Sequence, residues 1–101
     1  MGRLVTVART TDIPEGDAVG AEVGGERIAV FHYKGRFYAV SDVCPHAGGP
    51  LSQGWAADGK VTCPWHGWTF DIDPTEGTPD DGLRRYRVEV DGDEVKVEAP
   101  D

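Results

Sequence analysis

The chain has 101 residues, and its 18 acidic and 10 basic side chains give it a net charge of −8. Its length and its hydrophobic fraction of 39% predict a single domain, 1–101, with one modest core. The acidic balance argues against nucleic acid and anionic membranes as partners, because both are negatively charged and favour basic proteins.

Short segments in which apolar and polar residues alternate follow one another along the chain. This alternation is typical of strands that bury one face, and the 14 glycines and 7 prolines are typical of many short elements joined by turns. The pattern predicts an all-β fold of about ten short antiparallel strands, arranged as a small sandwich or barrel. The clearest predicted strands, in chain order, cover 4–8, 18–23, 27–33, 37–42, 83–90 and 94–98.

The alternation breaks in the middle of the chain, over about 43–73. Eight glycines and prolines fall within the 30 residues from Cys44 to Asp73. Such a segment shows too little core-facing pattern to be held by burial alone. Small structures short of core commonly rely on a metal or a disulfide, so we expect an inserted subdomain held by one of these.

Two short motifs in this segment each pair a cysteine with a histidine. Cys44 and His46 form a C-x-H motif, and Cys63 and His66 form a C-x-x-H motif that begins after 16 intervening residues. Thiolate and imidazole groups bind iron, zinc and copper. The four side chains are therefore candidate metal ligands.

The residues beside the candidate ligands favour tight loops. Pro45 and Pro64 each follow a cysteine directly and restrict the backbone there. Gly48 and Gly67 allow sharp bends and a close approach of the backbone to a bound group. Trp65 lies between two candidate ligands, and we expect it to be partly exposed at the rim of the site.

Two kinds of metal centre are compatible with this ligand set. A zinc ion would take two cysteines and two histidines in a tetrahedron, although structural zinc sites commonly pair like ligands in one motif. In a Rieske-type [2Fe–2S] cluster, one iron takes two cysteines and the other takes two histidines. Two loops that each supply one cysteine and one histidine favour the cluster and leave zinc as the alternative.

The segment CPHAGGPLSQG (44–54) followed by CPWHGWTFD (63–71) resembles the Rieske iron–sulfur family. The resemblance implies a Rieske-type fold over nearly the whole chain, with the cluster bound in the inserted subdomain. It also implies that Cys44 and Cys63 hold the inner iron, and that His46 and His66 hold the outer, more exposed iron.

Four positions differ from the branch of the family found in cytochrome bc complexes. The resemblance implies that Gly49 and Trp65 occupy the places of two further cysteines that form a disulfide in that branch. Trp68 and Phe70 likewise occupy the places of a serine and a tyrosine whose hydroxyls raise the reduction potential there.

The missing hydroxyl donors predict a low reduction potential. Donors to the cluster and its cysteine sulfur stabilise the reduced, more negative state, so their absence lowers the potential. We expect a value near the low end of the Rieske range, about −150 mV. Protein-film voltammetry would measure it, and a potential well above zero would contradict the inference.

The chain lacks residues for the other parts of an oxygenase system. A terminal oxygenase needs a second iron held by two histidines and a carboxylate, but only His32 remains of the three histidines. The chain also shows no flavin or nicotinamide motif. The resemblance therefore implies no catalytic site but a soluble one-electron carrier, similar to the ferredoxin component of bacterial aromatic-ring dioxygenase systems.

The expected partners of such a carrier are a flavin-dependent ferredoxin reductase and a terminal oxygenase. We expect a cytoplasmic location, because the sequence shows no signal segment and no apolar run of about 18 residues. We also expect a monomer. A small subunit of a nitrite-reductase-type enzyme and a redox-sensing Rieske module remain as alternatives.

Three further expectations concern residues outside the four ligands. We expect Trp68 to be a core residue, Trp55 to pack beneath the ligand loops, and His32 to be a structural or surface residue. The acidic stretch 71–82 lacks the ligand pattern of a calcium loop. It is predicted to be a solvated loop, and its charge is expected to be countered by the arginines Arg84, Arg85 and Arg87.

Overall fold

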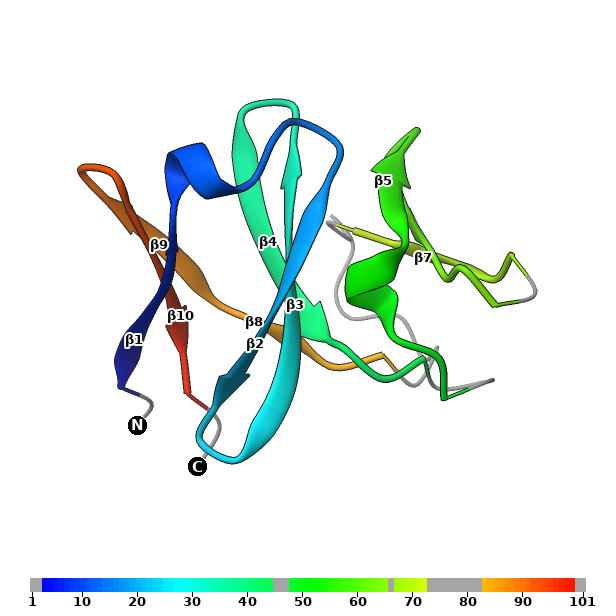
Figure 1. The fold of residues 1–101 in the computed structure, drawn as a ribbon, viewed down its shortest axis with the longest axis horizontal. Helices are drawn as coiled ribbons and strands as arrows, with labels where there is room; N and C mark the ends of the chain where they lie inside the picture. The colour runs from blue at the N-terminus through cyan, green and yellow to red at the C-terminus, as the bar shows by residue number, and fades with distance from the viewer. Residues whose placement is uncertain (1–2, 45–47, 66, 73–82, 100–101) are drawn as a thin grey trace.

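The computed structural model describes residues 3–44, 48–65, 67–72 and 83–99. These residues form ten strands and two short 3-10 turns (Figure 1), which confirms the predicted all-β class. None of the helical segments in this part of the chain has the length or apolar character needed to cross a bilayer. The elements are β1 (Leu4–Arg9), η1 (Thr10–Asp12), β2 (Ala18–Val23), β3 (Glu26–Tyr33), β4 (Arg36–Ser41), η2 (Leu51–Gln53), β5 (Trp55–Ala57), β6 (Lys60–Thr62), β7 (Thr69–Asp71), β8 (Arg85–Tyr86), β9 (Val88–Asp91) and β10 (Glu94–Glu98).

The strands form three antiparallel sheets. The strand orders are β1-β10-β9, β2-β3-β4-β8 and β5-β6-β7. Figure 1 shows the four-stranded sheet between the other two, with β5 and β7 at one side of the molecule and β1, β10 and β9 at the opposite side. The third sheet, β5-β6-β7, falls within the segment predicted to be an inserted subdomain.

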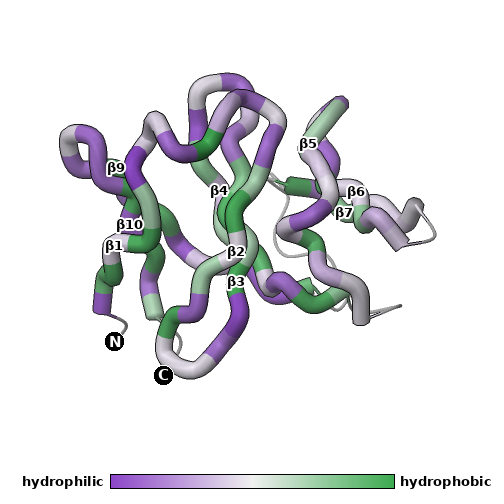
Figure 2. Tube along the Cα trace, in the orientation of Figure 1, coloured by the Kyte–Doolittle hydropathy of each residue, from purple (hydrophilic) through white to green (hydrophobic). Residues whose placement is uncertain are grey.

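Strand β3 is buried on both faces. Its residues Ile28, Ala29, Val30 and Phe31 are all 0% exposed. Because side chains alternate along a strand, Ile28 and Val30 join a buried cluster with Val95 and Val97 of β10, whereas Ala29 and Phe31 join a second cluster. Hydrophobic residues gather along the central strands in Figure 2.

The second cluster attaches the third sheet to the rest of the molecule. Besides Ala29 and Phe31 of β3, it contains Val61 of β6 and Phe70 of β7. Both cysteines belong to it as well. The middle segment therefore shares a core with β3, although its own sequence shows little alternation.

The segment 83–90, predicted to be one strand, is divided between two sheets. Arg85 and Tyr86 of β8 pair with Val40 and Ala39 of β4, but β9 pairs with β10. The break falls at Arg87, where the chain passes from one sheet to the next. Strands that change sheets commonly form such corners in sandwiches.

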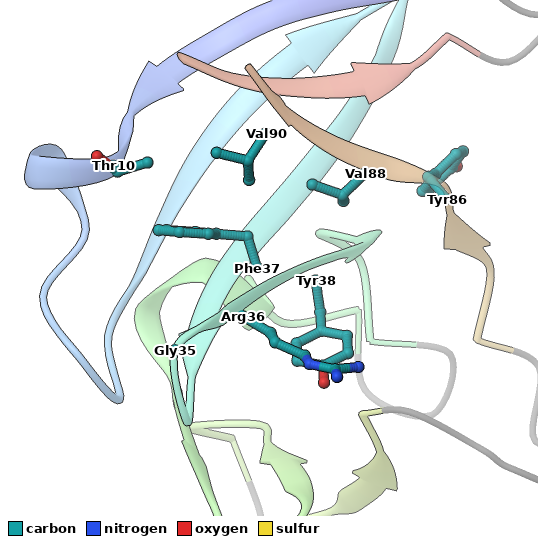
Figure 3. A pocket seen from close by; sticks show the side chains of 8 residues that line it. All are labelled: Thr10, Gly35, Arg36, Phe37, Tyr38, Tyr86, Val88 and Val90. Carbon is teal, nitrogen blue, oxygen red and sulfur yellow. The ribbon is translucent and has the colours of Figure 1, made fainter. Parts of the chain in front are cut away.

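A groove of about 600 Å³ opens beside β4, where the two-residue strand β8 ends (Figure 3). Phe37 of β4 and Val88 and Val90 of β9 lie on its apolar side. The groove contains neither cysteine, so it is distinct from the candidate metal centre. Its full lining is Thr10, Gly35, Arg36, Phe37, Tyr38, Tyr86, Val88 and Val90.

Candidate metal centre

The two cysteines lie side by side in the buried cluster against β3. Cys44 is 1% exposed and Cys63 is 0% exposed, and no disulfide joins them. Their thiols are close enough to hydrogen-bond to each other. Two buried and unbridged thiols at the ends of two loops are a suitable pair of ligands for one iron or zinc ion.

The protonation of Cys63 depends on its surroundings. Burial raises the pKa of the Cys63 thiol, and the neighbouring Cys44 thiol also raises it, whereas a hydrogen bond from the Trp65 backbone amide lowers it. A buried thiol that keeps its proton in the metal-free protein is expected to release it when a metal binds, since thiolate is the ligand form.

The first loop is closed by backbone hydrogen bonds at its base. The Cys44 N–H donates to the Gly49 carbonyl at 3.0 Å, and the Gly48 N–H donates to the Cys44 carbonyl at 2.8 Å. Val43 and Pro50, the residues next to Cys44 and Gly49, form an antiparallel bridge. The loop that carries the first motif therefore leaves and re-enters the fold at neighbouring points.

The second loop joins β6 to β7 and has the same closure. Thr62 pairs with Thr69, and the Cys63 N–H then donates to the Trp68 carbonyl at 2.8 Å. In both loops the cysteine bonds to the fifth residue after it.

A glycine occupies the fourth position after the cysteine in each loop. Gly48 has φ of 71° and Gly67 has φ of 70°, a left-handed conformation that favours glycine. Both glycines were predicted to support the site, and the structure explains why this residue type is needed. The two motifs thus share one local backbone design, although their histidines stand at different offsets.

The structure describes only some of the remaining residues that were predicted for the site. His46, His66 and Pro45 lie outside the described residues, so the structure brings together two of the four candidate ligands. Pro64 is half-buried beside Cys63. Among the described residues, no three cysteines, histidines or carboxylates gather as a metal site.

The tryptophans differ in part from the predictions. Trp65 is 51% exposed, as expected for a residue at the rim of the site. Trp68 is 46% exposed rather than part of the core, because it is the last residue of the second loop and directly precedes β7. Trp55 is 49% exposed rather than packed beneath the loops, because β5 directs Ala56 into the core and Trp55 outward.

His32 has the structural role that was expected. Its Nδ1 lies 2.7 Å from the Ile13 carbonyl oxygen, and its ring stacks on Phe37 with a centroid separation of 4.3 Å. These contacts give His32 a structural role that requires no metal.

Within the described part of the chain, one of the three arginines after the acidic stretch contacts a residue of that stretch. Arg85 donates to the Asp71 carbonyl from Nη2 at 2.7 Å. Arg84 pairs with Glu26 and Arg87 pairs with Glu89, and both glutamates lie outside the stretch. Residues 73–82 lie outside the described part of the chain, so the prediction of a solvated loop there stays a prediction.

Sequence reasoning missed Asp42, which anchors the first loop. Its carboxylate is 2% exposed and accepts a hydrogen bond from the Ser52 backbone amide at 2.6 Å. It also pairs with Arg27 at 3.0 Å. The Asp42 side chain thus ties the strand before Cys44 to the turn that follows the loop.

Replacing Asp42 by alanine is expected to lower the free energy of unfolding by about 2 kcal/mol. The change would leave the Ser52 N–H without its carboxylate, and unpaired buried donors are costly. Urea denaturation would measure the loss. The control is Asp93→Ala, which removes an exposed ion pair at 3.8 Å and is expected to cost less than about 1 kcal/mol. Equal losses for the two variants would contradict the anchoring role.

Two neighbouring buried thiols, on two loops of one backbone design, correspond to the half of the ligand set that would hold one iron of a cluster. The family described as "Rieske [2Fe-2S] domain" matches residues 3–90. The chain belongs to this family, and membership implies a Rieske-type [2Fe–2S] cluster as its cofactor.

Two curated relatives illustrate the range of proteins that contain this domain. Apoptosis-inducing factor 3 of Mus musculus is 33% identical over 97 residues, which cover 93% of this chain but only 16% of that protein. The 3-phenylpropionate/cinnamic acid dioxygenase ferredoxin subunit of Shigella boydii is 32% identical over 94 residues, covering 89% of this chain and 88% of the subunit. This chain therefore corresponds to a small part of the first relative and to most of the second.

Solved structures give a similar result over the full fold. The ferredoxin of carbazole 1,9a-dioxygenase from Nocardioides aromaticivorans has a TM-score of 0.80 and 30% identity, covering 97% of this chain and 98% of that one. A ferredoxin chain in a complex of reduced oxygenase and oxidised ferredoxin, also of carbazole 1,9a-dioxygenase, has a TM-score of 0.77 and 29% identity, covering 94% and 92%.

Proposed function

We propose that this protein is a one-electron carrier, a Rieske-type ferredoxin that passes electrons from a reductase to a terminal oxygenase. The observation that carries the proposal is the match to ferredoxins over most of their length, 98% of one solved ferredoxin chain and 88% of one curated subunit. Such a carrier needs no catalytic site of its own.

The proposed ligands are Cys44 and Cys63 for the inner iron and His46 and His66 for the outer iron. When bound, the cluster supplies one-electron oxidation and reduction. The buried position of the two cysteines supports this assignment, because it excludes water from the thiolate side. Pro45, Gly48, Pro64, Trp65 and Gly67 are proposed to shape the loops around these ligands.

The protein's own residues would restrict electron transfer to one side of the cluster. The thiolate side is enclosed by the buried cluster that contains Phe31, Val61 and Phe70, so electrons would enter and leave on the histidine side. The hydrogen bond from the Trp65 amide to the Cys63 sulfur would stabilise negative charge on that sulfur.

The proposed partners are a flavin-dependent ferredoxin reductase and a terminal oxygenase. The names of the ferredoxin relatives support an oxygenase partner, since each names a dioxygenase. We further propose that the chain acts as a cytoplasmic monomer and as one Rieske domain, 1–101, with its cluster-binding subdomain at about 43–73. The core that β3 shares with the third sheet supports the single domain.

The test of this function combines metal analysis with electron transfer. About two irons and two acid-labile sulfides per chain are expected, and the reduced protein should have a mean g value below that of the free electron. Stoichiometric zinc without sulfide would overturn the cluster. The protein should also accelerate electron flow from a flavin reductase to an oxygenase, compared with the reductase alone. No acceleration with several such pairs would favour a sensor or an enzyme subunit.

An apolar rim beside the loops is proposed as the docking surface. It consists of Val43, Trp65 and Trp68, whose side chains are 51%, 51% and 46% exposed. Val43 precedes Cys44, and Trp68 accepts the hydrogen bond that closes the second loop. Exposed aromatic residues commonly contribute much of the binding energy at protein interfaces.

Replacing Trp68 by alanine is expected to raise the carrier concentration needed for half-maximal oxygenase turnover about tenfold, which corresponds to about 1.4 kcal/mol of binding free energy. The cluster spectrum should stay unchanged. Trp55→Ala is the matched control, because Trp55 is equally exposed at 49% but lies outside the rim. A steady-state titration of oxygenase activity would measure both, and equal effects would contradict the docking role of the rim.

A further inference from the structure

The indole of Trp65, in the second loop, lies directly against Gly49 of the first loop. A β-carbon built at Gly49 would stand 2.8 Å from Cγ and Cδ2 of Trp65 and 3.2 Å from Cε3. Non-bonded carbon atoms pack at about 3.5–4.0 Å, so the glycine leaves room that no other residue would leave. Gly49 is buried although its neighbour Gly48 is exposed, and the indole accounts for this burial.

Each of the two residues in this contact also forms a hydrogen bond with the cysteine of its own loop. The Gly49 carbonyl accepts the N–H of Cys44 at 3.0 Å, and the Trp65 amide donates to the sulfur of Cys63. A displacement of either residue would therefore be transmitted to a cysteine. The contact connects the two loops at the positions where their relative placement matters most.

We propose that Trp65 and Gly49 form a clip that holds the two ligand loops together, which makes Trp65 a positioning residue for the cluster. The inference rests on the proposed ligation by Cys44, His46, Cys63 and His66. The clip keeps the loops closed over the cluster and limits the access of water to it.

The experiment measures how fast the cluster leaves the folded protein. Cluster-loaded wild type, Trp65→Ala and Gly49→Ala would be mixed with an excess of iron chelator, and the visible absorption of the cluster would be followed. Both variants are expected to release iron about 10- to 100-fold faster than wild type, because the loss of residues that support metal ligands typically lowers metal affinity by this factor. In Gly49→Ala the added methyl group displaces the indole, so the clip is lost while Trp65 is retained.

A second readout separates positioning from general stability. Water that reaches the cluster favours its more negative, reduced state, so Trp65→Ala is expected to raise the reduction potential. Trp65→Phe retains a ring over Gly49, and its release rate and potential are expected to lie close to those of wild type. Circular dichroism would check that each variant keeps its strands, and a folded variant that fails to acquire the cluster would also support the clip.

The matched control is Trp55→Ala, which removes an equally exposed tryptophan that is not among the nearest neighbours of Gly49. It should release iron at the wild-type rate. If the wild type binds a cluster but Trp65→Ala and Gly49→Ala lose it no faster than wild type, the clip is wrong and the proposed function stands. If the wild type binds no iron and sulfide, the ligation proposal itself fails.

Discussion

Replacing His66 by alanine is expected to leave less than about a tenth of the wild-type iron on the purified protein, while His32→Ala should leave iron content and spectrum unchanged. The two substitutions are chemically the same, so they separate a ligand from a structural histidine. His32 is held by the Ile13 carbonyl and by stacking on Phe37. The loss of these two contacts is expected to leave the cluster unaffected.

The same comparison extends to the buried cysteines. Cys63→Ala is expected to remove iron and sulfide together, because a cluster with one thiolate missing lacks a ligand for its inner iron. Iron and sulfide analysis, with the visible and electron paramagnetic resonance spectra, would show the result. Full iron content with unchanged spectra in Cys63→Ala or His66→Ala would contradict the proposed ligand set.

Gly54→Ala is the second substitution with a large expected effect. A β-carbon at Gly54 would lie 1.9 Å from the Thr62 carbonyl oxygen. This oxygen belongs to the backbone and the β-carbon is fixed to it, so neither atom can rotate away. Thr62 directly precedes Cys63, so relief of the clash would move a proposed ligand. We expect the free energy of unfolding to fall by about 3 kcal/mol or more, and cluster loading to fall with it.

Gly20→Ala provides the control for this steric argument. Its β-carbon would meet the Ser52 hydroxyl oxygen at 3.2 Å, and that side chain is able to rotate away. The expected loss is below about 1 kcal/mol. Urea denaturation followed by circular dichroism would compare the two variants, and a Gly54→Ala protein as stable as Gly20→Ala would show that the close approach is absent.

The strands were predictable where alternation and turn residues coincide. The strands 18–23 and 94–98 have their predicted bounds, since a glycine turn directly follows the first and directly precedes the second. The division of 83–90 was not predictable, because alternation continues through Arg87 while the pairing partner changes from β4 to β10. Pairing between distant strands leaves no trace in local periodicity.

The candidate site was predictable where residue type and spacing alone indicate the chemistry. Cysteines at a recognisable spacing indicate ligands, and the structure places Cys44 and Cys63 together. Asp42 gave no such signal, because its role depends on Ser52 and Arg27, which come near only in the folded chain. The exposure of Trp68 was missed for a similar reason, since an aromatic residue beside a strand is usually covered.

Strand β3 has a consequence for any attempt to transplant the redox centre into another protein. Neighbouring residues of this strand serve opposite ends of the molecule, Val30 facing β10 and Phe31 facing the cysteines. A graft of 43–73 alone would leave behind the surface on which both cysteines rest. A host scaffold would need its own strand with small and aromatic side chains placed like Ala29 and Phe31, so the portable unit is larger than the loops that carry the motifs.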